Sequence, residues 1–247
     1  MKNKYDKWEP WPCGAIPDKW KRPEINQLKE KGYKLKDMEI VETFEEKISK
    51  FTGSEYGVAI NGCTNAIFLS LMYLKHIGEL FEEDTITIPK RTYVSPAMTI
   101  INNGFNLKFE DLKWKGQYQL KDTRVWDSAT RFTENMFIGG DRLQCISFQS
   151  RKRLPIGRGG MVITNDKHAA DWLRKARIDG RDVSKHQFDD EYTFSGWNLY
   201  MTPDDAARGI LIFDDMTKDK KEFADYGSWE MYPDLSVKEF FKKYESR

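Results

Sequence analysis

The sequence has few of the features that mark secreted, metal-binding or membrane-bound proteins. Its three cysteines, Cys13, Cys63 and Cys145, are scattered without metal-ligand spacing, which predicts reduced thiols, no disulfide and no metal site. The N-terminus carries charges and prolines where a secretory signal needs an apolar run. No later run approaches the roughly 18 apolar residues of a membrane span. We therefore expect a soluble, cytoplasmic protein with no membrane partner.

An excess of charge is also missing. The 40 Lys and Arg residues face 39 Asp and Glu residues, so no global field draws the chain to nucleic acid or an anionic membrane. The run Arg151-Lys152-Arg153 could form a local basic patch, but aromatic residues do not interleave with it. We expect no nucleic-acid partner.

The apolar residues that are present suffice for one sizeable core, because 39% of the 247 residues are hydrophobic. Short apolar runs alternate with helical patterns, which predicts an α/β fold with a mostly parallel sheet covered by helices on both faces. The predicted strands are residues 56–60, 85–89, 107–112, 124–127, 143–148 and 160–164. The predicted helices are residues 39–51, 61–74, 95–104, 165–180 and 201–216, and residues 181–196 form a polar loop.

Three segments organise the chain. Residues 1–39 lack clear periodicity and are expected to be an arm that wraps a neighbour or the domain surface. Residues 40–216 form the α/β domain. Its last helix has a well-marked start, with Thr202 as N-cap and Pro203 at the first helical position. Residues 217–247 form a charged tail too short for a full second domain.

Candidate site residues follow several predicted strands, where open α/β sheets place their ligands. After residues 56–60, the turn Asn-Gly-Cys-Thr-Asn brings Thr64 and Asn65 to a helix N-terminus, which favours an anion such as phosphate. Alternatively this is an ordinary turn with Thr64 as N-cap. Tyr93, after residues 85–89, offers either a stacking face or a core contact.

Two ionisable residues follow later strands. Asp127 ends residues 124–127 in an apolar setting, where a buried carboxylate needs a partner. It would either cap the next turn or hold a protonated ligand nitrogen. Lys152 follows the strand that contains Ser147 and precedes a glycine-rich turn. An enclosed lysine has a lowered pKa and can attack a carbonyl, whereas an exposed one belongs to a solvated patch. An anion cradle, an aromatic face, a carboxylate and a lysine together match the needs of pyridoxal phosphate.

The same segments resemble the DegT/DnrJ/StrS sugar aminotransferases, which have the fold type I architecture of pyridoxal-phosphate enzymes. "ISFQSRKRLPIGRGGMVITND" is similar to the family's lysine motif, and "VAINGCTNAIFLSL", "IPKRTYVSPAMTIINNG", "VWDSAT" and "GWNLYMTPDDAARGIL" are similar to four further motifs in family order. The resemblance implies a Schiff-base lysine at Lys152, a pyridine-nitrogen partner at Asp127 and a stacking ring at Tyr93. It implies phosphate contacts from Thr64, Asn65 and Ser147, and from Asn198 of the partner subunit in a homodimer with shared sites.

Several positions depart from the family pattern. Thr130 replaces the usual Gln or His that contacts the cofactor, Arg158 replaces a glutamate, and Tyr200 replaces an arginine. The C-terminal domain that helps family members bind the sugar nucleotide is nearly absent from this sequence. The cofactor chemistry therefore looks intact, while the mode of substrate recognition is altered.

The resemblance implies an aminotransferase that moves an amino group from glutamate or glutamine to a keto sugar linked to a nucleotide. Two alternatives stay open. Family dehydratases carry a histidine at the lysine position, and Lys152 argues against that reaction. A non-catalytic binding or scaffold protein is favoured by the short C-terminus and by the changes at Thr130 and Arg158.

Overall fold

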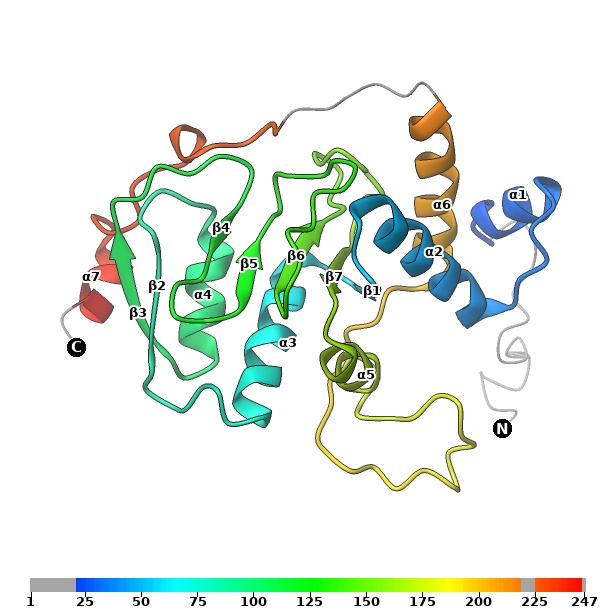
Figure 1. Ribbon diagram of the computed structural model, residues 1–247, viewed down its shortest axis with the longest axis horizontal. Helices are drawn as coiled ribbons and strands as arrows, with labels where there is room; N and C mark the ends of the chain where they lie inside the picture. The colour runs from blue at the N-terminus through cyan, green and yellow to red at the C-terminus, as the bar shows by residue number, and fades with distance from the viewer. Residues whose placement is uncertain (1–20, 219–224, 246–247) are drawn as a thin grey trace, which may run out of the picture.

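A computed structural model describes residues 21–218 and 225–245. Its centre is a five-stranded sheet in the order β1-β7-β6-β5-β4, and two further strands, β2 and β3, pair beside it. Figure 1 follows this order across the molecule, from β1 next to α2 to β2 and β3 at the end that carries α7. The strands are β1 (Tyr56–Ile60), β2 (Thr85–Pro89), β3 (Asn106–Glu110), β4 (Tyr118–Gln119), β5 (Val125–Asp127), β6 (Leu143–Ser147) and β7 (Gly160–Thr164).

The α/β class is confirmed, but the expectation of a mostly parallel sheet is wrong. Only β5–β6 and β2–β3 pair in parallel, whereas β1–β7, β6–β7 and β4–β5 are antiparallel. The reason lies in the connections. A parallel pair needs a crossover, usually a helix, and β6 returns to β7 through the turn that carries Lys152 instead. Strands β1, β5 and β6 share one direction, and β7 and β4 oppose them.

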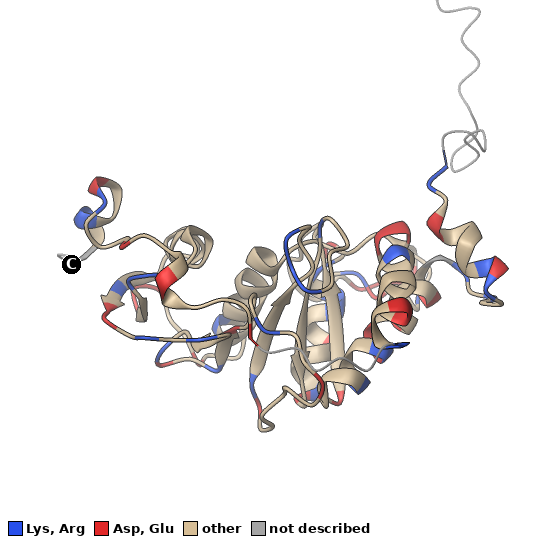
Figure 2. Cartoon of the chain, turned by 90° about the horizontal axis from the view of Figure 1, so that it is seen from above, with Lys and Arg blue, Asp and Glu red and all other residues tan. Residues whose placement is uncertain are grey.

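Helices cover both faces of this sheet, as predicted. On β1, Val58 and Ile60 join a core with α3, α4 and α5, while the intervening Ala59 joins a second core with α1, α2 and α6. This alternation follows the two-residue period of a strand. Figure 2 shows the strands almost free of charged residues, which gather on the outer helices and loops. The helices are α1 (Glu24–Glu30), α2 (Asp37–Thr52), α3 (Cys63–His76), α4 (Val94–Asn102), α5 (Lys167–Ala176), α6 (Pro203–Lys218) and α7 (Glu239–Glu245).

The two ends of the chain contain helices that the sequence analysis did not predict. Of the proposed arm, residues 1–20, which include Cys13, lie outside the described part, and residues 21–39 contain the unpredicted helix α1 packed on α6. Thr202 does cap α6, since its hydroxyl accepts from the N–H of Asp205 (3.2 Å). In the tail, residues 225–245 form a short 3₁₀ turn (Trp229–Met231) and α7. Cys63 and Cys145 are free thiols. The described helices include none long and apolar enough to span a bilayer.

One buried ion pair joins α2, β1 and the end of α5. Glu45 Oε1 accepts from the N–H of Ala59 (2.8 Å) and from Arg177 Nη1. Arg177 Nη1 also donates to the carbonyl of Ala59 (2.7 Å), and both side chains of the pair are only 4% exposed. Because both charges lie out of water, each depends on the other for compensation.

Glu45→Gln should therefore destabilise the protein by about 3–5 kcal/mol, because it leaves the Arg177 charge buried without its counter-ion. Urea unfolding monitored by circular dichroism measures this loss. Glu82→Gln, which removes the exposed partner of Lys75, is the control and should leave the unfolding midpoint close to that of the wild type. Equal midpoints for the two variants would contradict the role given to the buried pair.

Candidate active site

A cavity of about 590 Å³ opens at the edge of the sheet where β1, β5 and β6 end. Its volume lies within the roughly 300–1,000 Å³ typical of small-molecule sites. Seven of the eight predicted site residues line it, namely Thr64, Asn65, Tyr93, Asp127, Thr130, Ser147 and Lys152. The eighth, Asn198, lies outside this cavity on an exposed segment beside Ile178.

The turn after β1 presents free backbone N–H groups to the cavity. Helix α3 begins at Cys63, and its N-cap is Gly62, without a side-chain cap. The alternative of Thr64 as N-cap is therefore wrong, and Thr64 is exposed at the cavity. A Cβ on Gly160 of β7 would lie 2.4 Å from the backbone nitrogen of Cys63. Glycine at position 160 thus lets β7 pass directly beneath this helix start.

Asp127 is buried, and protein groups hold both of its oxygens. Oδ1 accepts from the N–H of Ala129 (2.9 Å), so Asp127 caps the next turn, as one of the two alternatives predicted. Oδ2 accepts from the hydroxyl of Tyr118 (2.9 Å), which is itself 2.8 Å from Thr92 Oγ1. A carboxylate offers about four lone-pair directions, so Asp127 retains capacity for a ligand donor.

The electrostatics of the cavity are set by burial. Burial raises the pKa of Asp127, and the hydrogen bonds from Ala129 and Tyr118 and the charge of Lys152 oppose this rise. Burial, together with the nearby Asp127, also raises the pKa of the Cys63 thiol well above its ordinary value. Cys63 is therefore a neutral thiol, and a cationic partner would offset the cost of burying a negative charge on Asp127.

The turn that carries Lys152 is closed by its own backbone. The N–H of Lys152 donates to the carbonyl of Gln149 (2.8 Å), and the N–H of Gly157 donates to the carbonyl of Phe148 (3.2 Å). The buried Leu154 fixes the turn to the core below. Lys152 itself is half-buried and faces the cavity, with Arg151 and Arg158 exposed on either side. Lys152 is therefore neither part of a fully solvated patch nor fully enclosed.

Aromatic side chains also line the cavity. Tyr93 is 59% exposed and lines the cavity beside Trp114. Sequence reasoning missed Trp114 and three residues from the tail, Tyr226, Met231 and Tyr232. The tail lacks helical or strand periodicity, so only its aromatic content signalled a packed segment.

The departures from the family pattern have structural consequences. Thr130 is buried, and its hydroxyl donates to the carbonyl of Gly116 (3.0 Å). Arg158 Nε donates to the carbonyl of Asn61 (3.2 Å), which ties the glycine turn to the start of α3. Tyr200 bridges to Ile60 at the end of β1. Thr130 and Arg158 line the cavity in these roles.

The donor set fits pyridoxal phosphate. It combines N–H groups at a helix start with Ser147 for a phosphate, the Tyr93 ring for stacking, the Asp127 carboxylate for a protonated ring nitrogen, and the Lys152 amine for the aldehyde. No single one of these features is specific. Their convergence on one cavity is what a site for pyridoxal phosphate requires.

Solved structures share the fold of this chain. The chain matches the Helicobacter pylori aminotransferase PseC, involved in pseudoaminic acid biosynthesis, with a TM-score of 0.61 and 17% identity, over 79% of this chain and 63% of that one. It matches a GDP-4-keto-6-deoxymannose-3-dehydratase with a TM-score of 0.63 and 15% identity, over 84% of this chain and 68% of that one. At these identities the likeness shows the fold, which is that of the fold type I large domain.

The family follows from the sequence comparison. The model of the DegT/DnrJ/EryC1/StrS aminotransferase family matches residues 18–138 and 129–230, and the chain belongs to this family. A curated relative is the spore coat polysaccharide biosynthesis protein SpsC of Bacillus subtilis (strain 168), 26% identical over 81% of this chain. The chain spans 64% of the length of SpsC.

The raised pKa of Asp127 gives a testable pH dependence in cofactor-free protein. A carboxyl whose pKa is higher in the folded state contributes stability below its unfolded pKa of about 3.9 that is lost as pH rises through the folded pKa. Asp127→Asn removes this loss. The variant should therefore be more stable than the wild type at pH 7.5, and the difference should vanish near pH 4. Urea unfolding at the two pH values measures it, and a difference independent of pH would contradict the burial argument.

Proposed function

We propose that this protein is a pyridoxal-phosphate-dependent aminotransferase that transfers an amino group from glutamate or glutamine to a keto sugar linked to a nucleotide. The observation that carries the proposal is the meeting of Lys152 and Asp127 in one cavity, at the ends of neighbouring parallel strands. Family membership supports the reaction class. The named function of SpsC, polysaccharide biosynthesis, supports a sugar as acceptor.

The residues divide the work of holding the cofactor. The N–H groups at the start of α3, with Thr64, Asn65 and Ser147, would hold the phosphate. Tyr93 would stack on the ring, and Asp127 would keep its nitrogen protonated. Thr130 would add little, because its hydroxyl is engaged with Gly116. When bound, pyridoxal phosphate supplies an electron sink for the negative charge that develops at the substrate α-carbon.

Proton transfer falls to Lys152. Its Nζ would take the proton from the α-carbon of the amino donor as general base and would then return a proton as general acid. Tyr118 would orient Asp127 through its 2.9 Å hydrogen bond and keep the carboxylate aimed along one direction. Burial of Asp127 strengthens its attraction for the ring cation, because the surrounding dielectric is low.

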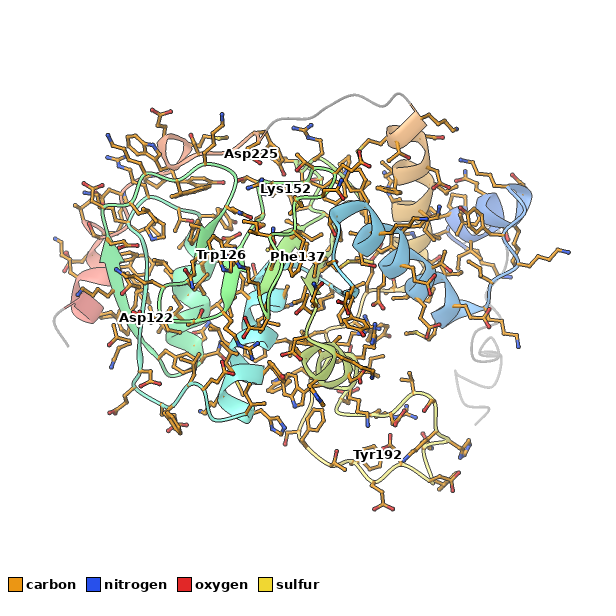
Figure 3. All side chains as sticks on the ribbon, viewed as in Figure 1. Asp122, Trp126, Phe137, Lys152, Tyr192 and Asp225 are labelled. Atoms are coloured by element: carbon orange, nitrogen blue, oxygen red, sulfur yellow. The ribbon has the colours of Figure 1, made fainter. Side chains whose placement is uncertain are left out.

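A homodimer with shared sites fits the position of Asn198. Asn198 is exposed and lies outside its own chain's cavity, so it is free to reach the cavity of a second copy. Beside it, residues 181–196 form the predicted polar loop, and Figure 3 places Tyr192 at its far end, away from Lys152. The interface would be isologous, with each subunit contributing to both sites. The free Cys63 and Cys145 thiols support a cytoplasmic location.

Covalent binding of the cofactor at Lys152 is the direct test of the cavity. We expect a visible absorption band when pyridoxal phosphate is added, and borohydride should then fix the cofactor to Lys152. Lys152→Ala should abolish both, because no other amine lines the cavity among the described residues. Lys108→Ala, at an exposed lysine of β3, is the matched control and should behave as the wild type. A colourless wild type with no labelled lysine would end the enzyme proposal.

The role of Asp127 predicts a second result. Asp127→Asn should still bind the cofactor, because Lys152 and the phosphate contacts remain, but its single-turnover reaction with glutamate should be at least about 100-fold slower, since each tenfold is about 1.4 kcal/mol of barrier. Asp122→Asn, at an exposed carboxylate that Figure 3 shows far from Lys152, is the control. Equal rates for Asp127→Asn and wild type would refute the role. A wild type that binds cofactor but reacts with no donor would favour a non-catalytic binding protein.

A further inference from the structure

We propose that residues 225–235, here called the tail wall, recognise the sugar nucleotide, with Tyr232 and Met231 contacting the sugar and Tyr226 anchoring the wall to the site. This inference rests on the proposed function and assigns substrate recognition to a segment outside the cofactor-binding motifs. Figure 1 shows the segment running along the edge of the sheet where the turn after β6 also lies, and Figure 3 labels both Asp225 and Lys152 toward this edge.

The tail wall is held by backbone hydrogen bonds to the segments around the cavity. The N–H of Gly116 donates to the carbonyl of Gly227 (2.8 Å), and the N–H of Trp229 donates to the carbonyl of Trp114 (3.2 Å). Further along, the N–H of Leu235 donates to the carbonyl of Lys90 (2.8 Å). These backbone hydrogen bonds hold the tail wall against the neighbouring segments, much as a ladder holds an edge strand to a sheet. The side chains of the tail wall therefore have fixed positions.

Two glycines allow the tail wall to pack closely against the residues beside the cavity. A Cβ on Gly227 would lie 2.4 Å from Thr130 Cβ, so the wall approaches Thr130 as only glycine allows. A Cβ on Gly116 would lie 2.4 Å from the carboxyl carbon of Asp225. The short side chain of Thr130, which departs from the family pattern, thus coincides with the place where the tail wall enters.

Tyr226 ties together the two segments that carry Asp127 and Lys152. Its hydroxyl donates to the carbonyl of Ala129 (3.1 Å) and accepts from the backbone of Arg153. The guanidinium of Arg153 also lies 5.3 Å from the centre of its ring. Burial raises the pKa of Tyr226 to about 12, so the hydroxyl stays protonated and can donate at neutral pH.

Tyr232 stands on a rigid aromatic base. Its ring stacks on Trp114 with centroids 5.8 Å apart, and Trp114 Nε1 donates to the carbonyl of Arg91 (2.8 Å). Trp229, in the turn before it, is covered by the cations of Arg91 and Lys113 at 5.9 and 5.5 Å. Beside this base, Met231 lines the cavity with 63% of its surface exposed. An exposed apolar side chain at a cavity is available to a ligand.

The residues that line the cavity match a sugar diphosphate. One wall offers Tyr226, Met231 and Tyr232, and a hexose ring has C–H faces that pack on such surfaces. Arg151 and Arg158 also line the cavity and are exposed, and their planar guanidinium groups suit phosphate oxygens. Gln149 and Asn61 line the same cavity and could supply partners for hydroxyl groups. A sugar without an anionic group would leave the two arginines unused.

The test measures binding of UDP-glucose, dTDP-glucose and GDP-mannose to protein loaded with pyridoxal phosphate, by calorimetry. Tyr232→Ala should weaken the best-bound probe by about five- to tenfold, in line with the loss of one aromatic contact. Tyr226→Phe keeps the ring and removes the anchor, and should weaken the same probe by a similar factor. Phe240→Ala, on α7 outside the cavity and 42% exposed, is the matched control and should bind the probe as the wild type does.

The affinity for the cofactor and the single-turnover rate with glutamate separate this inference from the proposed function. In Tyr232→Ala, the fold-loss of probe affinity should be at least five times the fold-loss of the single-turnover rate with glutamate. This result supports the role of the tail wall in substrate recognition. Unchanged probe affinity, or equal losses in both measurements, overturns it while leaving the aminotransferase proposal standing. Binding of none of the three probes by a wild type that reacts with glutamate also overturns it. A wild type without cofactor binding refutes the proposed function itself.

Discussion

The parallel pairing of β5 with β6 is the constraint on which the site depends. This pairing sets Asp127 opposite Cys145, so the carboxylate and the turn after Ser147 leave the sheet at the same edge. In an antiparallel pair the two segments would emerge at opposite ends of the strands. The short crossover between β5 and β6 therefore brings an acid and an amine from different segments into one cavity.

Burial then gives each charge its role. Asp127 lies in a low-dielectric position that raises its pKa, and Tyr118 and Ala129 compensate for only part of that cost. A cationic ligand group would complete the compensation, which is a physical reason for such a site to select a protonated ring nitrogen. Lys152 remains half-buried on a turn fixed by backbone bonds, where it can meet both ligand and water.

The local elements could be predicted from the sequence, whereas their long-range arrangement could not. Residues 56–60, 85–89 and 160–164 are strands with the predicted limits, because short apolar runs with clear turn signals encode strands locally. The direction of β7 depends on how its connection to β6 folds, and this is not written in the strand itself. The family motifs identified seven of the residues that line the cavity, and the roles of those residues remain predictions. Tyr226, Met231 and Tyr232 lie in a charged segment without periodicity, so their approach to the cavity emerges only in three dimensions.

A crystal structure of the protein with pyridoxal phosphate tests the central claim most directly. We expect continuous density between the cofactor and Lys152 Nζ, and the ring nitrogen within about 2.7–3.2 Å of an Asp127 carboxylate oxygen. The phosphate should lie at the start of α3. A cofactor bound elsewhere, or a ring turned so that its nitrogen points away from Asp127, would contradict the roles proposed for Lys152 and Asp127.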